Sequence, residues 1–171
     1  MRYFIMEQTN NYMPQIILPY SIKQKIDIKS GEKNIDENVN IWKVKGNKFT
    51  LYPDILIKPL LLLRQGAKNI LQMYEQKTIF RQVILFDKEN EVTMQYYFPL
   101  LPEINIKQRK RDEVSLSKED FLTIKRASLL KMREGKKIYY VANLEIIESF
   151  LKKGLTGIEI ESIKFLDKEI D

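Results

Sequence analysis

Cysteine and histidine are both missing from the 171 residues of this chain. Without cysteine, the protein cannot form disulfides, iron–sulfur clusters or thiolate zinc sites. Without histidine, it lacks the usual general base at neutral pH and the commonest metal ligand. The Ser-His-Asp, Cys-His and histidine-zinc designs of catalysis are therefore excluded.

Long hydrophobic runs and glycine-rich loops are missing as well. The longest apolar stretch, residues 55–63, is interrupted by Lys58 and Pro59, whereas a helix needs about 20 apolar residues to cross a membrane. The apolar run at residues 3–6 is too short for the core of a signal peptide. None of the six glycines belongs to a phosphate-binding pattern. We therefore expect a cytoplasmic protein with no cofactor, no small-molecule substrate and no membrane contact.

One catalytic pattern remains after these exclusions, which is Ser-x-x-Lys. It occurs four times, at Ser30–Lys33, Ser115–Lys118, Ser128–Lys131 and Ser149–Lys152. None of the four is accompanied by the Lys-Thr-Gly and Ser-Asp-Asn motifs of Ser-Lys acyl transferases. The carboxylates Glu159 and Glu161 alternate with isoleucines, which is typical of the solvated face of a strand. We expect no catalytic residues and no metal site, so the chain is predicted not to be an enzyme.

Hydrophobic periodicity predicts a single α+β domain over residues 1–171, with a mixed, largely antiparallel sheet and a few helices. Strands are expected at residues 2–7, 78–86, 92–98, 138–142 and 158–161, the second buried on both faces and paired with the third as a hairpin. Short strands are expected near Ile26–Ile28 and Ile41–Val44. Residues 122–132 fit either a helix or a strand.

Two helices are predicted from apolar residues at helical spacing. The first presents Ala67, Ile70, Leu71 and Tyr74 on one face. The second begins at Asn143 as N-cap, presents Ile146, Ile147, Phe150 and Leu151, and ends at Gly154.

Positive charge is concentrated in one segment. The net charge is +6, and residues 107–137 hold 11 of the 29 basic and 5 of the 23 acidic residues, so the rest of the chain is neutral. The densest part contains Lys107, Arg109, Lys110 and Arg111. We expect residues 103–113 to be loop-like and residues 107–113 to be exposed, because unpaired charges are costly to bury. These four cations are the candidate partner-binding residues, either for an acidic protein surface or for nucleic-acid phosphates.

The C-terminal part of the chain contains three short motifs at residues 139–142 (YYVA), 148–154 (ESFLKKG) and 157–158 (GI). Together they resemble the closing motif of an immunity-protein family of bacterial polymorphic-toxin systems. Weaker matches to that family follow its order at residues 3–6, 53–54, 82–86 and 96–100. Family members tend to have a serine-type cap where this sequence reads Arg64-Gln65-Gly66. The resemblance implies an α+β fold, a cognate toxin as partner and no catalytic residues.

We therefore expect an immunity protein that neutralises its toxin by stoichiometric binding. The alternative is a nucleic-acid-binding module that uses residues 107–137, although no aromatic residues lie within the basic run to stack on bases. The aromatics Trp42, Tyr96, Tyr97, Tyr139 and Tyr140 fit either an interface or the core.

Overall fold

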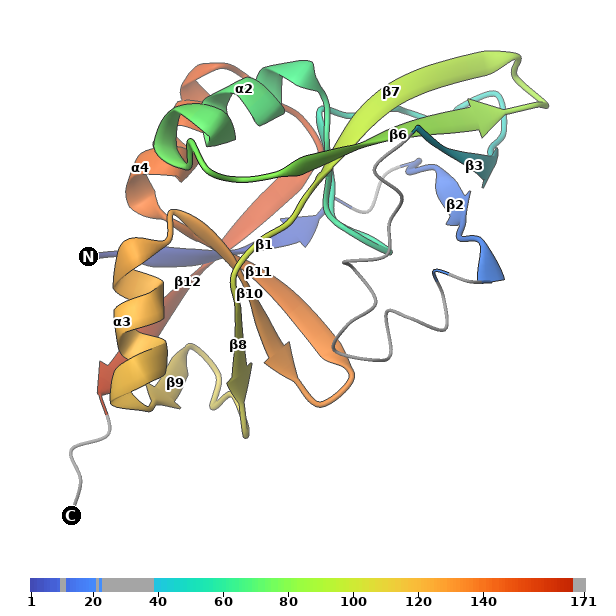
Figure 1. Ribbon diagram of the computed structural model, residues 1–171. Helices are drawn as coiled ribbons and strands as arrows, with labels where there is room; N and C mark the ends of the chain where they lie inside the picture. The colour runs from blue at the N-terminus through green and yellow to red at the C-terminus, as the bar shows by residue number, and fades with distance from the viewer. Residues whose placement is uncertain (10–11, 21, 23–38, 168–171) are drawn as a thin grey trace.

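The computed structural model describes residues 1–9, 12–20, 22 and 39–167. Within this part of the chain, twelve strands form two six-stranded sheets, which Figure 1 shows together with their helices. The first sheet has the order β8-β10-β11-β1-β12-β9. Its strands are β1 (Tyr3–Gln8), β8 (Glu103–Ile106), β9 (Glu113–Leu116), β10 (Leu129–Glu134), β11 (Lys137–Asn143) and β12 (Ile158–Asp167).

The second sheet has the order β2-β3-β6-β7-β5-β4. Its strands are β2 (Gln15–Ile17), β3 (Asn40–Lys45), β4 (Ile55–Leu56), β5 (Leu62–Leu63), β6 (Phe80–Asp87) and β7 (Val92–Pro99). The pairings β8–β10, β9–β12 and β3–β6 are parallel, and the other described pairings are antiparallel. The α+β class with largely antiparallel strands is confirmed, but the strands are divided between two sheets where the sequence predicts one.

The described helices are α2 (Gln65–Tyr74), α3 (Lys118–Arg126) and α4 (Leu144–Lys152). Helix α4 is capped as predicted, because the Asn143 side chain accepts a hydrogen bond from the Ile146 N–H at 3.1 Å. Gly154 follows the helix with a φ of 65°, which is the left-handed geometry that glycine tolerates best. Helix α2 begins after Arg64 without a side-chain cap. Among the described residues, no helix has the length and apolar character needed to cross a membrane.

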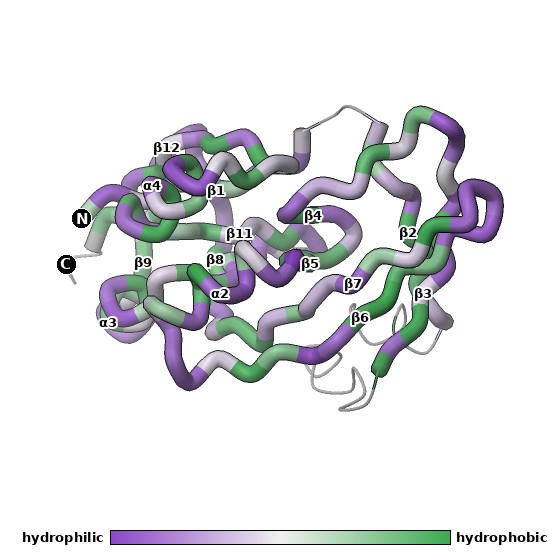
Figure 2. The backbone as a smooth tube through the Cα atoms, turned by 90° about the horizontal axis from the view of Figure 1, so that it is seen from above, coloured by the Kyte–Doolittle hydropathy of each residue, from purple (hydrophilic) through white to green (hydrophobic). Residues whose placement is uncertain are grey.

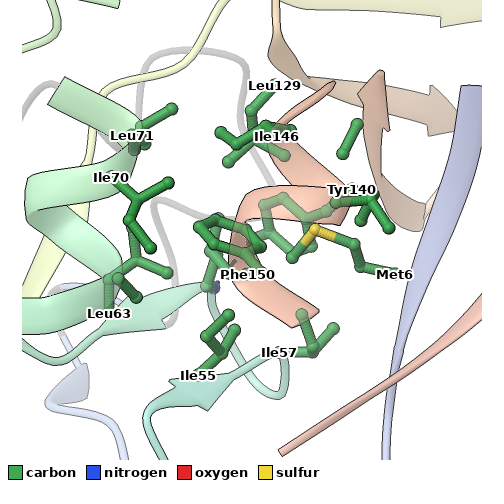
Figure 3. Close-up of a cluster of buried hydrophobic side chains, with 14 residues drawn as sticks. Met6, Ile55, Ile57, Leu63, Ile70, Leu71, Leu129, Tyr140, Ile146 and Phe150 are labelled. Atoms are coloured by element: carbon green, nitrogen blue, oxygen red, sulfur yellow. Dashed lines mark hydrogen bonds between the residues drawn. The ribbon is translucent and has the colours of Figure 1, made fainter. Parts of the chain in front are cut away.

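A shared core joins the two sheets (Figure 3). Phe150 of α4 lies at its centre, with Met6 and Tyr140 of the first sheet on one side and Ile55 and Leu63 of the second sheet on the other. Complete burial of each large apolar side chain contributes roughly 1.5–3 kcal/mol. Because the same cluster includes residues of α2, α4 and both sheets, the sheets form one α+β domain.

The central hairpin is confirmed, with β6 and β7 paired from Phe80↔Pro99 to Asp87↔Val92. Strand β6 is not buried on both faces, however. Val83, Leu85 and Asp87 are buried, whereas Phe86 is exposed. Within the described part of the chain, no helix or second sheet covers this face of the hairpin, as one would cover a strand inside a layered α/β sheet.

Other differences concern local structure. Residues 103–106 form strand β8 and not a loop, because Ile104 and Ile106 are buried at alternate positions. Residues 122–132 contain both alternatives, the end of α3 and the start of β10. Leu151 is exposed and does not belong to the buried face of α4. The strand expected near Ile26–Ile28 lies outside the described residues.

Candidate partner-binding site

The predicted basic run forms a tight turn between β8 and β9. Lys110 and Glu113 form an isolated antiparallel bridge, with N···O distances of 3.0 Å and 2.9 Å between their backbone groups. Arg111, between them, has a φ of 52°. We call residues 107–113 the basic turn. Its hydrogen bonds give it a defined shape, and the side chains of Lys107, Lys110 and Arg111 are exposed as predicted.

Arg109 is different, and the prediction that it is exposed is wrong. Its side chain is 16% exposed, and its Nη2 donates to Glu161 Oε1 of β12 at 2.6 Å. Its guanidinium also lies 5.6 Å from the centre of the Tyr139 ring. Arginine forms both contacts at once because its planar cation pairs with carboxylates and stacks on aromatic rings. Arg109 therefore anchors the turn to the first sheet.

Glu134 completes this anchor. Its Oε1 accepts the Arg109 backbone N–H at 2.9 Å, and its Oε2 accepts the Tyr139 hydroxyl at 3.1 Å. The bond from the Arg109 N–H is the largest influence that lowers the pKa of Glu134, and it outweighs partial burial, which raises it. The Arg109–Glu161–Tyr139–Glu134 network thus uses the central cation of the basic run for structure.

Two further cations of the basic segment lie in the first sheet, where Lys131 is buried and Arg133 is half-buried. Glu103 Oε2 lies 3.1 Å from Lys131 Nζ, and Glu103 Oε1 lies 2.8 Å from Arg133 Nε. Burial, assisted by the charge of Arg133, lowers the pKa of Lys131 to about 8. Sequence reasoning counted both cations as available to a partner, because the chain does not reveal that β8 lies beside β10.

These pairings also bear on the Ser-x-x-Lys patterns. Lys131 has a carboxylate partner, so it does not fit the unpaired lysine that activates a serine. Ser149 Oγ lies 2.7 Å from the Tyr74 hydroxyl, and Lys152 pairs with Glu148 at 3.7 Å. The pattern that begins at Ser30 lies outside the described residues. Within the described part of the chain, no three His, Cys, Asp or Glu residues form a group suited to a metal ion.

The groove beside the basic turn has balanced charge. It encloses about 480 Å³, and its charged lining residues are Lys107, Lys110, Glu113 and Asp120. Asp120 is held by Ser117, whose Oγ donates to Asp120 Oδ2 at 2.7 Å. Two cations thus face two carboxylates, so the basic run does not produce a positively charged groove.

A second surface, on the second sheet, was not singled out by sequence reasoning. Strands β2, β3, β6 and β7 present the same face outward, and its residues are Gln15, Ile17, Ile41, Lys43, Lys45, Ile84, Phe86, Thr93 and Gln95. We call this set the open face. Ile17, Ile41 and Phe86 are 51%, 67% and 39% exposed. Figure 1 shows these strands extending away from α2 and α4, and Figure 2 shows hydrophobic positions along β3 and β6.

A buried polar network fixes one end of the open face. Asp87 at the end of β6 accepts hydrogen bonds from the Tyr52 hydroxyl and from Asn90 Nδ2, both at 2.6 Å. The Tyr52 bond is the largest influence on the pKa of Asp87, which is lowered despite burial. A Cβ on Gly46 would lie 2.2 Å from Asp87 Oδ2, so glycine is needed there. The open face is therefore held in shape before any partner binds.

The aromatic residues divide between core and surface. Trp42, Tyr96 and Tyr140 are buried, and the two tyrosine hydroxyls bond to the backbone, at Pro53 O and Leu61 N. Tyr97 and Tyr139 are half-buried. No family model matches this chain, and no curated protein matches it either.

Proposed function

We propose that this protein neutralises a toxin by binding it stoichiometrically, and that the open face is its contact surface. The observation that carries the proposal is the exposure of Ile17, Ile41 and Phe86 on one face of three neighbouring strands, β2, β3 and β6. Large patches of exposed apolar side chains are rare on monomeric proteins, and where they occur they often mark a protein-binding surface. These exposed apolar side chains suit a protein partner better than a nucleic-acid backbone, which would contact only the two lysines of this face.

The charge of the open face further restricts the kind of partner that fits it. Lys43 and Lys45 lie on the open face, which includes no carboxylate. A complementary partner has acidic side chains next to its apolar patch, because opposite charges accelerate encounter and select the orientation. The family resemblance of the sequence supports a toxin as that partner. Inhibition of this kind needs only a preformed surface and slow dissociation, which come from interface packing.

Co-expression with the protein encoded by the neighbouring gene tests the proposal. Cells that produce that protein should survive only when this chain is present, and the two purified proteins should form a stable complex. Ile41→Glu combined with Phe86→Glu should abolish protection and weaken the complex at least about a hundredfold, because both changes place charges in the centre of an apolar contact.

The matched control is Met73→Glu, since Met73 is 76% exposed on α2, outside the open face. Circular dichroism should show that all three proteins are folded. Protection that survives the double change on the open face contradicts the assignment of this surface. Protection without a detectable complex contradicts stoichiometric binding altogether.

A nucleic-acid-binding function is the second candidate, because Lys107, Lys110 and Arg111 remain exposed on the basic turn. It predicts binding to duplex or single-stranded nucleic acid that weakens steeply with salt. Lys110→Glu combined with Arg111→Glu should abolish that binding while leaving toxin protection intact. Salt-sensitive binding lost in this variant would favour the second candidate.

A further inference from the structure

A third groove differs from the others in its charge. It encloses about 640 Å³ between α3, the C-terminal half of β12 and the start of β1. Its charged lining residues are Arg2, Lys125 and Lys164, and none of the described residues contributes a carboxylate to its lining. By contrast, the groove beside the basic turn has two cations and two carboxylates, and so does a groove lined by Lys58, Lys137, Glu7 and Glu159. We call the positively charged one the cationic groove.

The three cations come from distant parts of the chain. Arg2 precedes β1, Lys125 lies in the last turn of α3, and Lys164 lies on β12 just beyond the last residue paired with β1. Figures 1 and 2 both place α3 and β12 beside the N-terminus. Among the residues that the structure describes, none of the three cations forms an ion pair. Their charges therefore add to a positive field in the groove.

The floor of the cationic groove is aromatic. Tyr3 and Phe165 pack edge to face with ring centres 5.3 Å apart, and both belong to the core cluster beneath α3. Phe121 of α3 and Phe165 are only half-buried, so each leaves apolar surface accessible from the groove. The groove thus combines an apolar floor with a cationic rim.

We propose that the cationic groove binds an acidic peptide segment that carries an apolar side chain. The carboxylates of such a segment pair with Arg2, Lys125 and Lys164, while its apolar side chain covers Phe121 and Phe165. Charge complementarity selects this occupant, because a neutral or basic segment would leave three cations facing each other without a counter-charge. This site is separate from the open face, and its occupancy does not depend on whether the open face binds a toxin.

Single-stranded nucleic acid also combines negative charge with flat apolar surface, but the aromatic floor fits it poorly. Bases need an accessible ring face on which to stack. The Tyr3 ring is buried, and the Lys125 ammonium lies over the Phe121 ring, 4.6 Å from its centre. Of the three rings, one is thus buried and one has a lysine ammonium over it, so less ring face is left for a stacked base than apolar surface for a peptide side chain.

Fluorescence anisotropy with three labelled probes tests this proposal on the full chain. The first probe is the peptide EEFDEL, the second is its amide counterpart QQFNQL, and the third is a hexathymidine oligonucleotide. We expect the acidic peptide to bind at low salt and the amide peptide to bind at least about tenfold more weakly. Lys125→Glu combined with Lys164→Glu should weaken binding of the acidic peptide at least about tenfold.

The matched control is Lys107→Glu combined with Lys110→Glu, which changes the same number of lysines in the charge-balanced groove and should leave peptide binding unchanged. Equal binding of the acidic and amide peptides would overturn the proposal, and so would an equal loss in both variants. Binding of hexathymidine that is tighter than that of the acidic peptide and lost only in the Lys125/Lys164 variant would overturn it in favour of nucleic acid. The variant with Ile41→Glu and Phe86→Glu should still bind the acidic peptide. Peptide binding in the cationic groove can then be judged independently of toxin binding on the open face.

Discussion

The basic turn and the cationic groove are neighbouring regions, but their cations are distributed differently along the sequence. Leu166 lines both the groove beside the basic turn and the cationic groove. The basic turn comes from the densest run of cations in the chain, yet Arg109 is paired with Glu161 and the adjoining groove is neutral. The cationic groove comes from single cations scattered over the chain, and within the described part of the chain no carboxylate lines it.

The difference shows that a run of charge in a sequence does not define a charged surface. Carboxylates from other strands neutralise cations that are adjacent in the sequence when the fold brings them together. Cations that are paired in this way contribute to the free energy of folding. Cations that form no ion pair within the described part of the chain keep their charge available to a ligand. Stability measurements on variants of each group can therefore test whether the paired cations are structural and the unpaired ones are not.

The largest effect is expected for Glu103→Ala. This change leaves Lys131 and Arg133 without their shared carboxylate, and the side chains of these two cations are only 5% and 12% exposed. Removing one partner of a buried ion pair costs about 3–5 kcal/mol, which urea unfolding at pH 7 would measure. Adding Lys131→Met should recover part of the loss, because it removes a buried charge that has lost its ion pair with Glu103. No recovery would mean that Lys131 is not the source of the cost.

A smaller effect is expected for Arg109→Ala. The change removes the 2.6 Å bond to Glu161 and the contact with the Tyr139 ring. Because the Glu161 side chain is 44% exposed, solvent screens the pair, and we expect a loss of about 1 kcal/mol. Amide exchange of Lys110 and Glu113 should accelerate as the basic turn loosens. Arg109→Lys serves as control and should restore charge without restoring the ring contact.

The contribution of Glu134 to the stability of the basic turn should depend on pH. The folded state lowers the pKa of this carboxyl below its ordinary value of 4.5, so its stabilising contribution is complete above that pH and is lost as pH falls through the folded value. The stability difference between the wild type and Glu134→Gln should be below about 1 kcal/mol at pH 7 and should shrink towards pH 3. A difference that grows on acidification would contradict this assignment.

The smallest effect is expected in the cationic groove. Lys125→Ala combined with Lys164→Ala removes two exposed cations that form no ion pair within the described part of the chain. The free energy of unfolding should change by less than about 0.5 kcal/mol. A loss comparable with that of Glu103→Ala would show that these lysines are structural and would remove the contrast between the two regions.

The sequence by itself determined the elements whose signals are local. Helices α2 and α4 follow from the spacing of apolar residues, and Asn143 caps α4 as predicted. The β6–β7 hairpin follows from two β-prone segments separated by a short polar turn. Each of these depends on residues within one or two turns or one strand pair. The absence of cysteine and histidine likewise excluded whole classes of chemistry without reference to the fold.

Tertiary structure alone decided how the strands divide into two sheets and which charges meet. Glu103 reaches Lys131 because β8 pairs with β10, and Arg109 reaches Glu161 across 52 positions of sequence. The same pairing of distant segments exposes the open face and brings Arg2, Lys125 and Lys164 around one groove. These arrangements could not be read from the chain, because the energy of a charge or an apolar side chain depends on what the fold places beside it.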